Sequence, residues 1–300
     1  MWPLQGNRGW LALLVLWVTG CRVVERPLEP EVNQETSQRL TFQSLHLRQV
    51  GTNGQVLWNL RAQQAVVNPQ TRQVQVRQLA GDIYDQGQPR YHVQTAQATV
   101  QEQGETLTIQ GQLIARDLKE KTQIQTQALT WRPQPQELVL TGNPALQHPN
   151  LQAKAQEATI QLRLNQVALR KSVQVISRQP ALHIHGEALD WQWQKGHIQA
   201  GQPVHIRYTP QQLVVQAGQG YLDVPNQVLR LTQGVQAVHP QGQLRAQQVE
   251  WRIAAQEVTA LGQVFYRHNN PPLTVTGSRA DGNLATQYIR VHQASTQWVP

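Results

Sequence analysis

The stretch ETLTIQGQLIA at residues 105–115 alternates apolar and polar side chains, with threonine and isoleucine among them. Alternation of this kind, rich in β-branched residues, is typical of a strand that buries one face. The segments HVQTAQATV (92–100) and QVLRLTQGVQAV (227–238) repeat the pattern, and turn-forming stretches such as EQG, PQPQ and VPN separate the segments. The sequence therefore predicts an all-β fold, with a weak helical pattern confined to residues 153–164.

The strands recur at a nearly constant spacing of 29 to 33 residues. One strand of each repeat carries a small or aliphatic residue in a similar frame: Ala65, Ala98, Ala128, Ala158, Ala188, Gly220, Val249 and Ala280. The returning strand carries a second marker at a similar spacing: Gly81, Gly111, Gly142, Ser172, Gly201, Gly234 and Gly262. A fixed period of this size indicates a stack of units in which each unit leans on its neighbours.

The expected architecture is an elongated, twisted β-jellyroll or β-taco stack of about eight two-strand units, mostly antiparallel within its layers. Eight units at the usual strand spacing give a body about 40 Å long. The apolar faces would enclose either a dry core or a channel, because small markers leave volume unfilled. The candidate inward or groove-lining residues of the first half are Val74, Val76, Val93, Val100, Leu107, Ile109, Leu113, Ile124, Leu138 and Leu140.

The N-terminus has the pattern of a targeting signal. Arg8 precedes an apolar run at residues 10–18 that is too short to span a bilayer. Small residues then precede Cys21, the only cysteine of the chain, as in a bacterial lipobox whose cysteine is acylated. We therefore expect a lipoprotein signal peptide at 1–20, a lipid anchor at Cys21 and a tether at 21–40. The alternative is an ordinary signal peptide with an incidental cysteine.

Composition narrows the function classes. Charged residues make up 15% of the chain and the formal net charge is +8, which suits an anionic partner such as a lipid headgroup or an acidic glycan. The basic residues are scattered, so nucleic acid is not an expected partner. No nucleophile elbow, zinc-protease motif or phosphate-binding loop is present, and carboxylates are sparse. The sequence predicts a protein that is not an enzyme and has no cofactor.

Two further groups of residues are candidate sites. His183 and His185 share a strand face, and His197 and His205 follow nearby, but such histidines are more often exposed strand residues than metal ligands, so no metal site is predicted. Trp131, Trp191 and Trp251 lie 60 residues apart, which favours a structural role over sugar stacking.

The segment 45–100 resembles the LptC family, the membrane-anchored periplasmic component of the lipopolysaccharide export machinery. The resemblance is good over 42–145 and fades into a general similarity to LptA/OstA-like β-jellyroll proteins through about residue 290. Known members are shorter and use a transmembrane helix. The residues that carry the resemblance are Leu57, Trp58, Leu60, Ala62, Ala65, Val74, Val76, Gly81, Tyr84, Gly87, Pro89, Ala96 and Ala98.

The resemblance implies an LptC-like β-jellyroll at 41–150, continued as an OstA/LptA-like stack at 151–300. It implies a lipid-anchored carrier on the periplasmic face of the inner membrane. Such a carrier receives lipopolysaccharide from an inner-membrane ABC transporter and passes it along an apolar β-groove to a periplasmic LptA/OstA-like bridge protein docked by edge strands. The alternatives are a polysaccharide-binding or a structural β-solenoid envelope lipoprotein.

Overall fold

The computed structural model describes residues 40–103 and 105–298 and forms one sheet of 25 strands. The strand pairings are antiparallel, and the only helix among the described residues is the short 3-10 turn η1 (Thr209–Gln211). The described part of the chain has no helix with the length and apolarity needed to cross a bilayer. The fold is thus the all-β, elongated β-jellyroll that the alternating pattern predicts.

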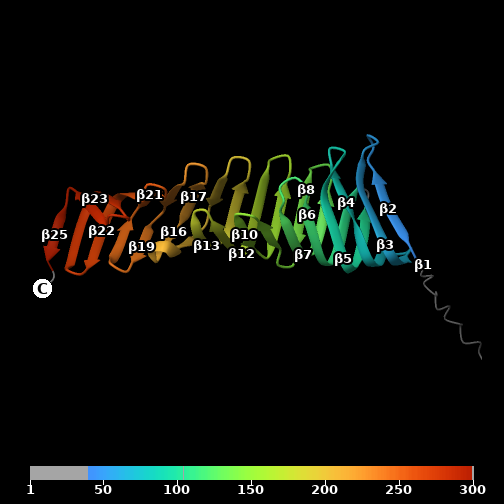
Figure 1. Ribbon diagram of the computed structural model, residues 1–300, viewed down its shortest axis with the longest axis horizontal. Helices are drawn as coiled ribbons and strands as arrows, with labels where there is room; N and C mark the ends of the chain where they lie inside the picture. Colours follow the sequence, from blue (N-terminus) through green and yellow to red (C-terminus); the bar gives the residue numbers. More distant parts are fainter. Residues whose placement is uncertain (1–39, 104, 299–300) are drawn as a thin grey trace, which may run out of the picture. The chain divides into compact units, whose positions relative to one another are not determined.

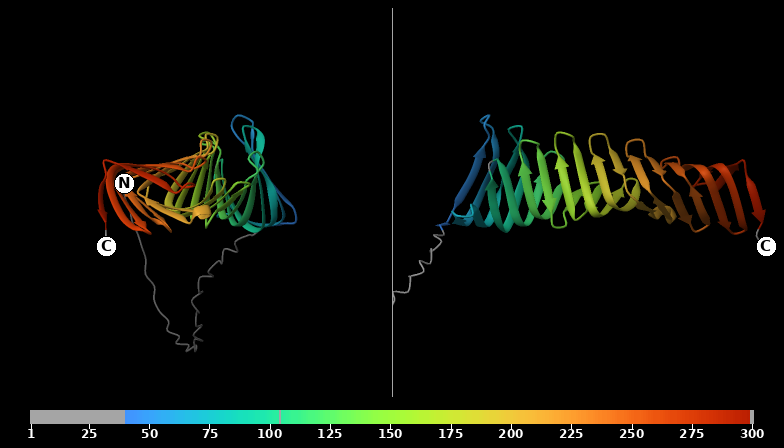
Figure 2. Two further views of the ribbon diagram at one scale, coloured as in Figure 1. Left: turned by 60° about the vertical axis from the view of Figure 1, so that its left-hand side comes forward. Right: turned by 180° about the vertical axis from the view of Figure 1, so that it is seen from behind.

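Figures 1 and 2 show the strands following one another in chain order along the long axis, from β1 and β2 at one end to β25 at the other. The strands are β1 (Leu40–Phe42), β2 (Leu45–Val50), β3 (Val56–Asn68), β4 (Gln73–Asp85), β5 (Gln88–Gln103), β6 (Thr106–Asp117), β7 (Gln123–Arg132), β8 (Glu137–Thr141), β9 (Ala145–His148), β10 (Leu151–Lys154), β11 (Glu157–Gln161), β12 (Gln166–Arg178), β13 (Ala181–Gln192), β14 (His197–Ala200), β15 (Val204–Tyr208), β16 (Leu213–Ala217), β17 (Gln219–Asp223), β18 (Val228–Thr232), β19 (Val235–His239), β20 (Gly242–Ala246), β21 (Gln248–Arg252), β22 (Glu257–Asn269), β23 (Pro272–Asn283), β24 (Tyr288–His292) and β25 (Ser295–Trp298).

Each long strand bends at its middle and so contributes one half to each of two facing layers. Layer 1 contains β2, β9, β10, β15, β16, β19, β20, β25 and the halves 56–62, 79–85, 88–95, 113–117, 123–126, 173–178, 181–186, 264–269 and 272–277. Layer 2 contains β1, β8, β11, β14, β17, β18, β21, β24 and the remaining halves. The two layers are joined along one side by the bends.

The second sequence marker lies at or close to these bends; in β4 the bend is at Gln78, whose φ is 51°, and Gly81 follows three residues later inside layer 1. At Gly81 a Cβ atom would overlap the carbonyl oxygen of Asn59 on the neighbouring strand, so only glycine fits. Ser172 has a φ of 52°, the left-handed conformation that turns strand β12 from one layer to the other. The strand register shifts at the same place, between Arg170 and Val173.

The apolar side chains of both layers point into a common core. Most of the first markers lie there too, but Ala128 and Ala188 do not, because their neighbours Leu129 and Leu189 take the inward positions with exposures of 0% and 2%. The expected length of about 40 Å is wrong. Every bent strand occupies both layers, so each two-strand unit adds two strand spacings and the body is roughly 80 Å long.

The sides of the layers opposite the bends end in hairpin turns, and polar side chains bridge these turns from layer to layer. Gln136 donates from its amide nitrogen to Asp85 at 3.0 Å, and the backbone N–H of Thr52 donates to Glu105 at 3.3 Å. Farther along, Gln211 donates to the side-chain oxygen of Gln256 at 2.8 Å. These bridges close the open side of the jellyroll at both ends of the filled interior.

The helical pattern suggested at 153–164 is wrong. The segment forms β10 and β11 with a bend at residues 155–156, and Ala153, Ala158 and Ile160 face the core because strand partners on both sides fix the register. The sheet runs without interruption across residue 150, where Leu151 pairs with His148 in the turn between β9 and β10.

Candidate functional site

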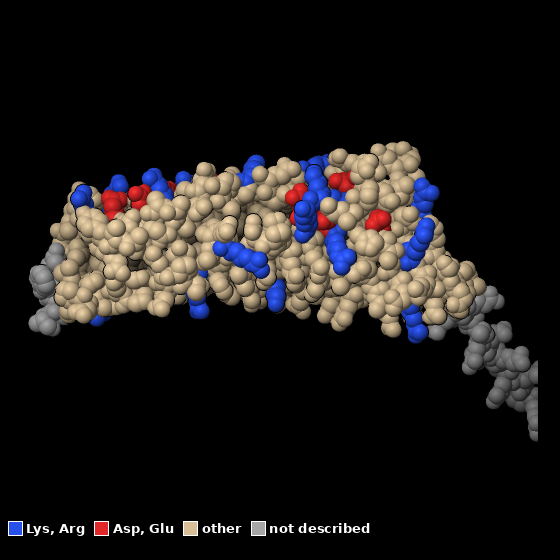
Figure 3. Space-filling model, in the orientation of Figure 1, with Lys and Arg blue, Asp and Glu red and all other residues tan. Residues whose placement is uncertain are grey.

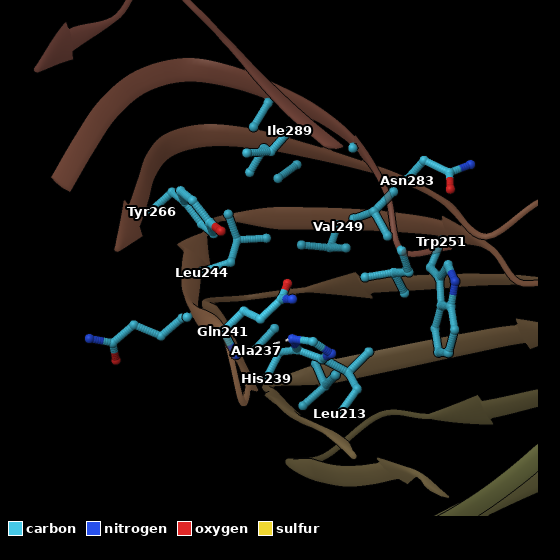
Figure 4. A pocket seen from close by; sticks show the side chains of 18 of the residues that line it. Leu213, Ala237, His239, Gln241, Leu244, Val249, Trp251, Tyr266, Asn283 and Ile289 are labelled. Carbon is cyan, nitrogen blue, oxygen red and sulfur yellow. Dashed lines mark hydrogen bonds between the residues drawn. The ribbon is translucent and has the colours of Figure 1, made fainter. Parts of the chain in front are cut away.

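The C-terminal third of the jellyroll contains an apolar cavity of about 130 Å³ between the two layers (Figure 4). Layer 1 supplies inward side chains of β16, β19, β20 and the second half of β22, and layer 2 supplies those of β18, β21, β22, β23 and β24. The main apolar lining residues are Leu213, Val215, Leu231, Ala237, Leu244, Val249, Trp251, Val258, Ala260, Tyr266, Ala280 and Ile289.

The cavity exists because large side chains give way to small ones along two rows of layer 2. The row nearest the turns is Leu107, Trp131, Leu138, Ile160, Val167, Trp191, Ile198, Leu222, Leu229, Trp251, Val258, Gly282 and Ile289. The row nearest the bends ends with Gly220, Leu231, Val249, Ala260, Ala280 and Val291. After Trp251, the side chains no longer fill the space between the layers.

Polar groups are few and lie mainly at the rim. His239 and Gln241 stand on one side of the cavity and Asn283 on the other (Figure 4). Burial raises the pKa of the Tyr266 phenol above its usual value, so this group is neutral and can donate a hydrogen bond. The indole N–H of Trp251 is buried without a hydrogen-bond partner in the described chain. The cavity thus combines an apolar wall with donors that can meet a carbonyl or hydroxyl of a bound amphiphile.

An aromatic and amide contact closes the inner end of the cavity. The rings of Tyr208 in layer 1 and Trp251 in layer 2 meet edge to face, with centroids 4.9 Å apart. Gln256 accepts a hydrogen bond from Gln211 at 2.8 Å and donates one to the carbonyl oxygen of Ile253. Beyond this contact, toward the N-terminus, the interior is filled by large side chains such as Trp131.

The structure places the ten groove candidates in the N-terminal half of the interior, where Val74 and Val100 also line a more open depression of about 680 Å³ beside Leu47 of β2. Nine of them are at most 3% exposed, and Val74 packs against them half-buried. None of the ten lines the cavity near the C-terminus. The sequence signal for the cavity is the succession of Ala260, Ala280 and Gly282 at inward positions, in the half of the chain that contains none of the ten candidates. Contact of the ten residues with lipid stays a prediction.

The four histidines are not brought together. His185 pairs across strands with His205, and His183 with Arg207, all on the outer side of layer 1. His197 lies in layer 2, where its ring is 4.0 Å from Asp223. The three tryptophans share one row, with Trp131 and Trp251 at 1% and 2% exposure and Trp191 half-buried, so their spacing reflects core packing. Cys21 and the tether at 21–40 fall outside the described residues apart from Leu40, which begins β1.

A larger and more open depression of about 1210 Å³ follows the outer side of the bends. Its rim is formed mainly by glutamine side chains: Gln63, Gln78, Gln94, Gln97, Gln112, Gln125 and Gln127. Amide groups cannot shelter hydrocarbon from water, so the inter-layer cavity is the better candidate for an apolar ligand. Among the described residues there is no cluster of three or more histidine, cysteine or carboxylate side chains able to hold a metal ion.

Fold and cavity together define a two-layered β-jellyroll with an apolar interior, the class of protein suited to holding a lipid. The family described as lipopolysaccharide-assembly, LptC-related matches residues 10–177, more than half of the chain, and the protein belongs to the LptC family. No curated protein matches the chain. Membership implies a part in lipopolysaccharide transport rather than catalysis, together with lipopolysaccharide binding, interaction with Lpt transporter components and association with the periplasmic side of the inner membrane.

Proposed function

We propose that this protein is a membrane-tethered periplasmic carrier. It receives lipopolysaccharide from an inner-membrane ABC transporter and passes it along the interior of the jellyroll to the next bridge protein. The observation that carries the proposal is the apolar cavity between the layers in a chain of the LptC family. Residues 1–20 serve as the signal peptide, Cys21 as the lipidated anchor, residues 21–40 as the tether, 41–150 as the LptC-like jellyroll and 151–300 as its continuation.

The energetic need for such an interior is large. Each acyl CH₂ exposed to water costs about 0.8 kcal/mol, so several acyl chains leaving a bilayer cost tens of kcal/mol unless a protein covers them. A cavity of about 130 Å³ is close to the roughly 150 Å³ that accommodates one benzene-sized group. In our proposal the acyl chains therefore enter by parting the two layers along the side closed by the turn-to-turn bridges, where Gln211 and Gln256 meet.

The ends of the sheet supply the docking surfaces of the proposal. β1 and β2 pair only with β3, and β24 and β25 only with β23, among the described strands. Unpaired strand edges accept a further strand from a partner. In the proposal, one edge meets the transporter and the other meets the LptA/OstA-like bridge protein, so that the interiors join end to end.

Photo-crosslinking tests the carrier function. A benzoylphenylalanine is placed at Ile289 in the cavity, at Ile109 in the filled interior and, as a matched control, at Thr232 on the outside of layer 2. In vesicles that contain the transporter, lipopolysaccharide is expected to label at Ile289 and, when ATP is supplied, at Ile109. Labelling at Thr232 alone contradicts the proposal and favours surface binding of a polysaccharide. Absence of labelling at all three positions indicates a structural protein.

A further inference from the structure

The outer surfaces of the two layers differ in charge in the C-terminal half. From residue 145 onward, layer 2 carries every carboxylate of the strands, and most are paired: Glu157 with Lys171, Asp190 with Arg170, Glu250 with Arg230 and Arg252, and Asp281 with Arg279. Over the same length, the described part of layer 1 contains no aspartate or glutamate. In the lower half of Figure 3 every coloured side chain is blue, whereas red and blue side chains adjoin along the upper edge.

The outward positions of layer 1 form two neighbouring rows across the strands. One row is Gln152, Ile176, His183, Arg207, Val214, Val238, Gln243 and Arg267. The other is Lys154, Gln174, His185, His205, Gln216, Gln236, Arg245 and Phe265. We call these two rows the cationic face. Its arginines and lysine make no ion pair with described residues, so their charge is available to a partner.

Apolar side chains stand among these cations. Ile176 and Val238 are 40% and 45% exposed, which places them among the most exposed large hydrophobic residues of the described chain. The Arg245 guanidinium lies over the Phe265 ring, 5.9 Å from its centroid. Arginine on an aromatic or aliphatic base presents its charge outward while its stem covers apolar surface. The cationic face therefore exposes charged groups and apolar side chains next to each other.

We propose that the cationic face rests on the surface of an anionic lipid bilayer. Interfacial binding by a protein surface combines buried apolar side chains with electrostatic attraction to anionic headgroups, and both components are present here. A bilayer provides many negative charges without fixed positions. This matches the four cations Lys154, Arg207, Arg245 and Arg267, which are spread over a face of eight strands rather than gathered into a pocket. The proposal goes beyond lipid carriage, because it assigns the outside of layer 1 and leaves the interior free.

A local fluorescence measurement tests the proposal in the full-length chain. Cys21→Ser removes the native thiol, and Val238→Cys introduces one for a polarity-sensitive dye. The matched control carries the dye at Leu261→Cys, which is 41% exposed on the outside of layer 2. With vesicles of phosphatidylcholine and phosphatidylglycerol in equal parts, the emission at position 238 is expected to shift to the blue and the emission at 261 to remain unchanged. Vesicles of phosphatidylcholine alone are expected to shift neither.

Two triple variants distinguish the effect of the arginines on the cationic face from the effect of the net charge of the protein. Arg207→Gln, Arg245→Gln and Arg267→Gln together should abolish the shift at position 238, whereas Arg170→Gln, Arg230→Gln and Arg252→Gln, which remove the same charge from layer 2, should preserve it. Equal losses in both sets, equal shifts at both dye positions, a shift with neutral vesicles or no shift at all would each overturn the proposal. The comparison of the two dye positions needs no arginine substitution, so it holds even where a triple variant fails to fold.

Discussion

The phenol ring of Tyr208 and the indole ring of Trp251 meet edge to face across the two layers, with centroids 4.9 Å apart and planes inclined by 76°. This pair stands where the filled interior ends and the cavity begins. We expect the two rings to be coupled in stability. In a double-mutant cycle of Tyr208→Leu and Trp251→Leu, urea unfolding should give a coupling energy of about 1 kcal/mol. Tyr208→Phe keeps the ring and should retain the coupling; an additive cycle would mean that the rings only fill space.

Filling the cavity should separate ligand binding from stability. Ala280→Leu places extra carbon atoms in unfilled space, so we expect little loss of stability but weaker crosslinking of lipopolysaccharide at Ile289. Ala158→Leu, at an equivalent inward position of the filled interior, should lower the free energy of unfolding by about 1–3 kcal/mol through overpacking. Thermal melts and crosslinking yields of the two variants check this. Similar destabilisation by both changes would show that the two interiors are equally filled.

The buried ion pair near the N-terminal end should be sensitive to loss of one charge. The Arg90 guanidinium and the Asp117 carboxylate are 2.6 Å apart, with side chains only 10% and 7% exposed. Asp117→Asn keeps the oxygen that accepts the backbone N–H groups of Lys119 and Glu120 but leaves the arginine uncompensated, so unfolding should become easier by about 3 kcal/mol. The exposed pair of Arg132 provides the control: Arg132→Gln should cost less than about 1 kcal/mol. Equal costs in urea titrations would contradict the assignment.

Acid should weaken the last strands through Asp281. Hydrogen bonds from Arg279 lower the pKa of this carboxyl to about 2, helped by Thr259 on β22 and His292 on β24. Because the pKa is lower in the folded than in the unfolded chain, the stabilisation is complete above about pH 4 and is lost as the pH falls toward 2. The group is partly exposed, so the effect should stay below about 1 kcal/mol. Asp281→Asn should be less stable than the native chain at pH 7, and the difference should shrink as the pH falls toward 2, measured by hydrogen exchange of β24 amides.

Much of the fold follows from the sequence because alternation and repeat spacing both report strand pairing in register. The glycine and serine markers located the bends except in β4, where the bend is at Gln78 rather than Gly81, and the tryptophan spacing located one core row. The prediction that each small marker faces inward is wrong at Ala128 and Ala188, where the neighbouring leucine takes the inward position. The error arises because an alternating pattern does not distinguish small from large apolar residues. Residues 153–164 show the same ambiguity, because a bend at 155–156 breaks the period of two.

The position of the cavity was not evident from alternation. Inward-facing residues can be recognised along a strand, but whether they touch depends on the side chains of the opposite layer, which lie far away in sequence. Val93 and Ile109 face inward as expected and are completely buried. The cavity near the C-terminus lies where Ala260, Ala280 and Gly282 oppose modest side chains such as Ala237. The outward charge pattern also becomes visible only once the bends assign each half-strand to a layer.

Each bent strand hydrogen-bonds mainly to the strands just before and just after it, so among the described strands no pairing ties the two ends of the jellyroll together. Such a chain is expected to unfold strand by strand, beginning at a free end. The C-terminal strands around the cavity are the least well packed. They are therefore expected to separate first on warming, while the N-terminal half keeps its strand register.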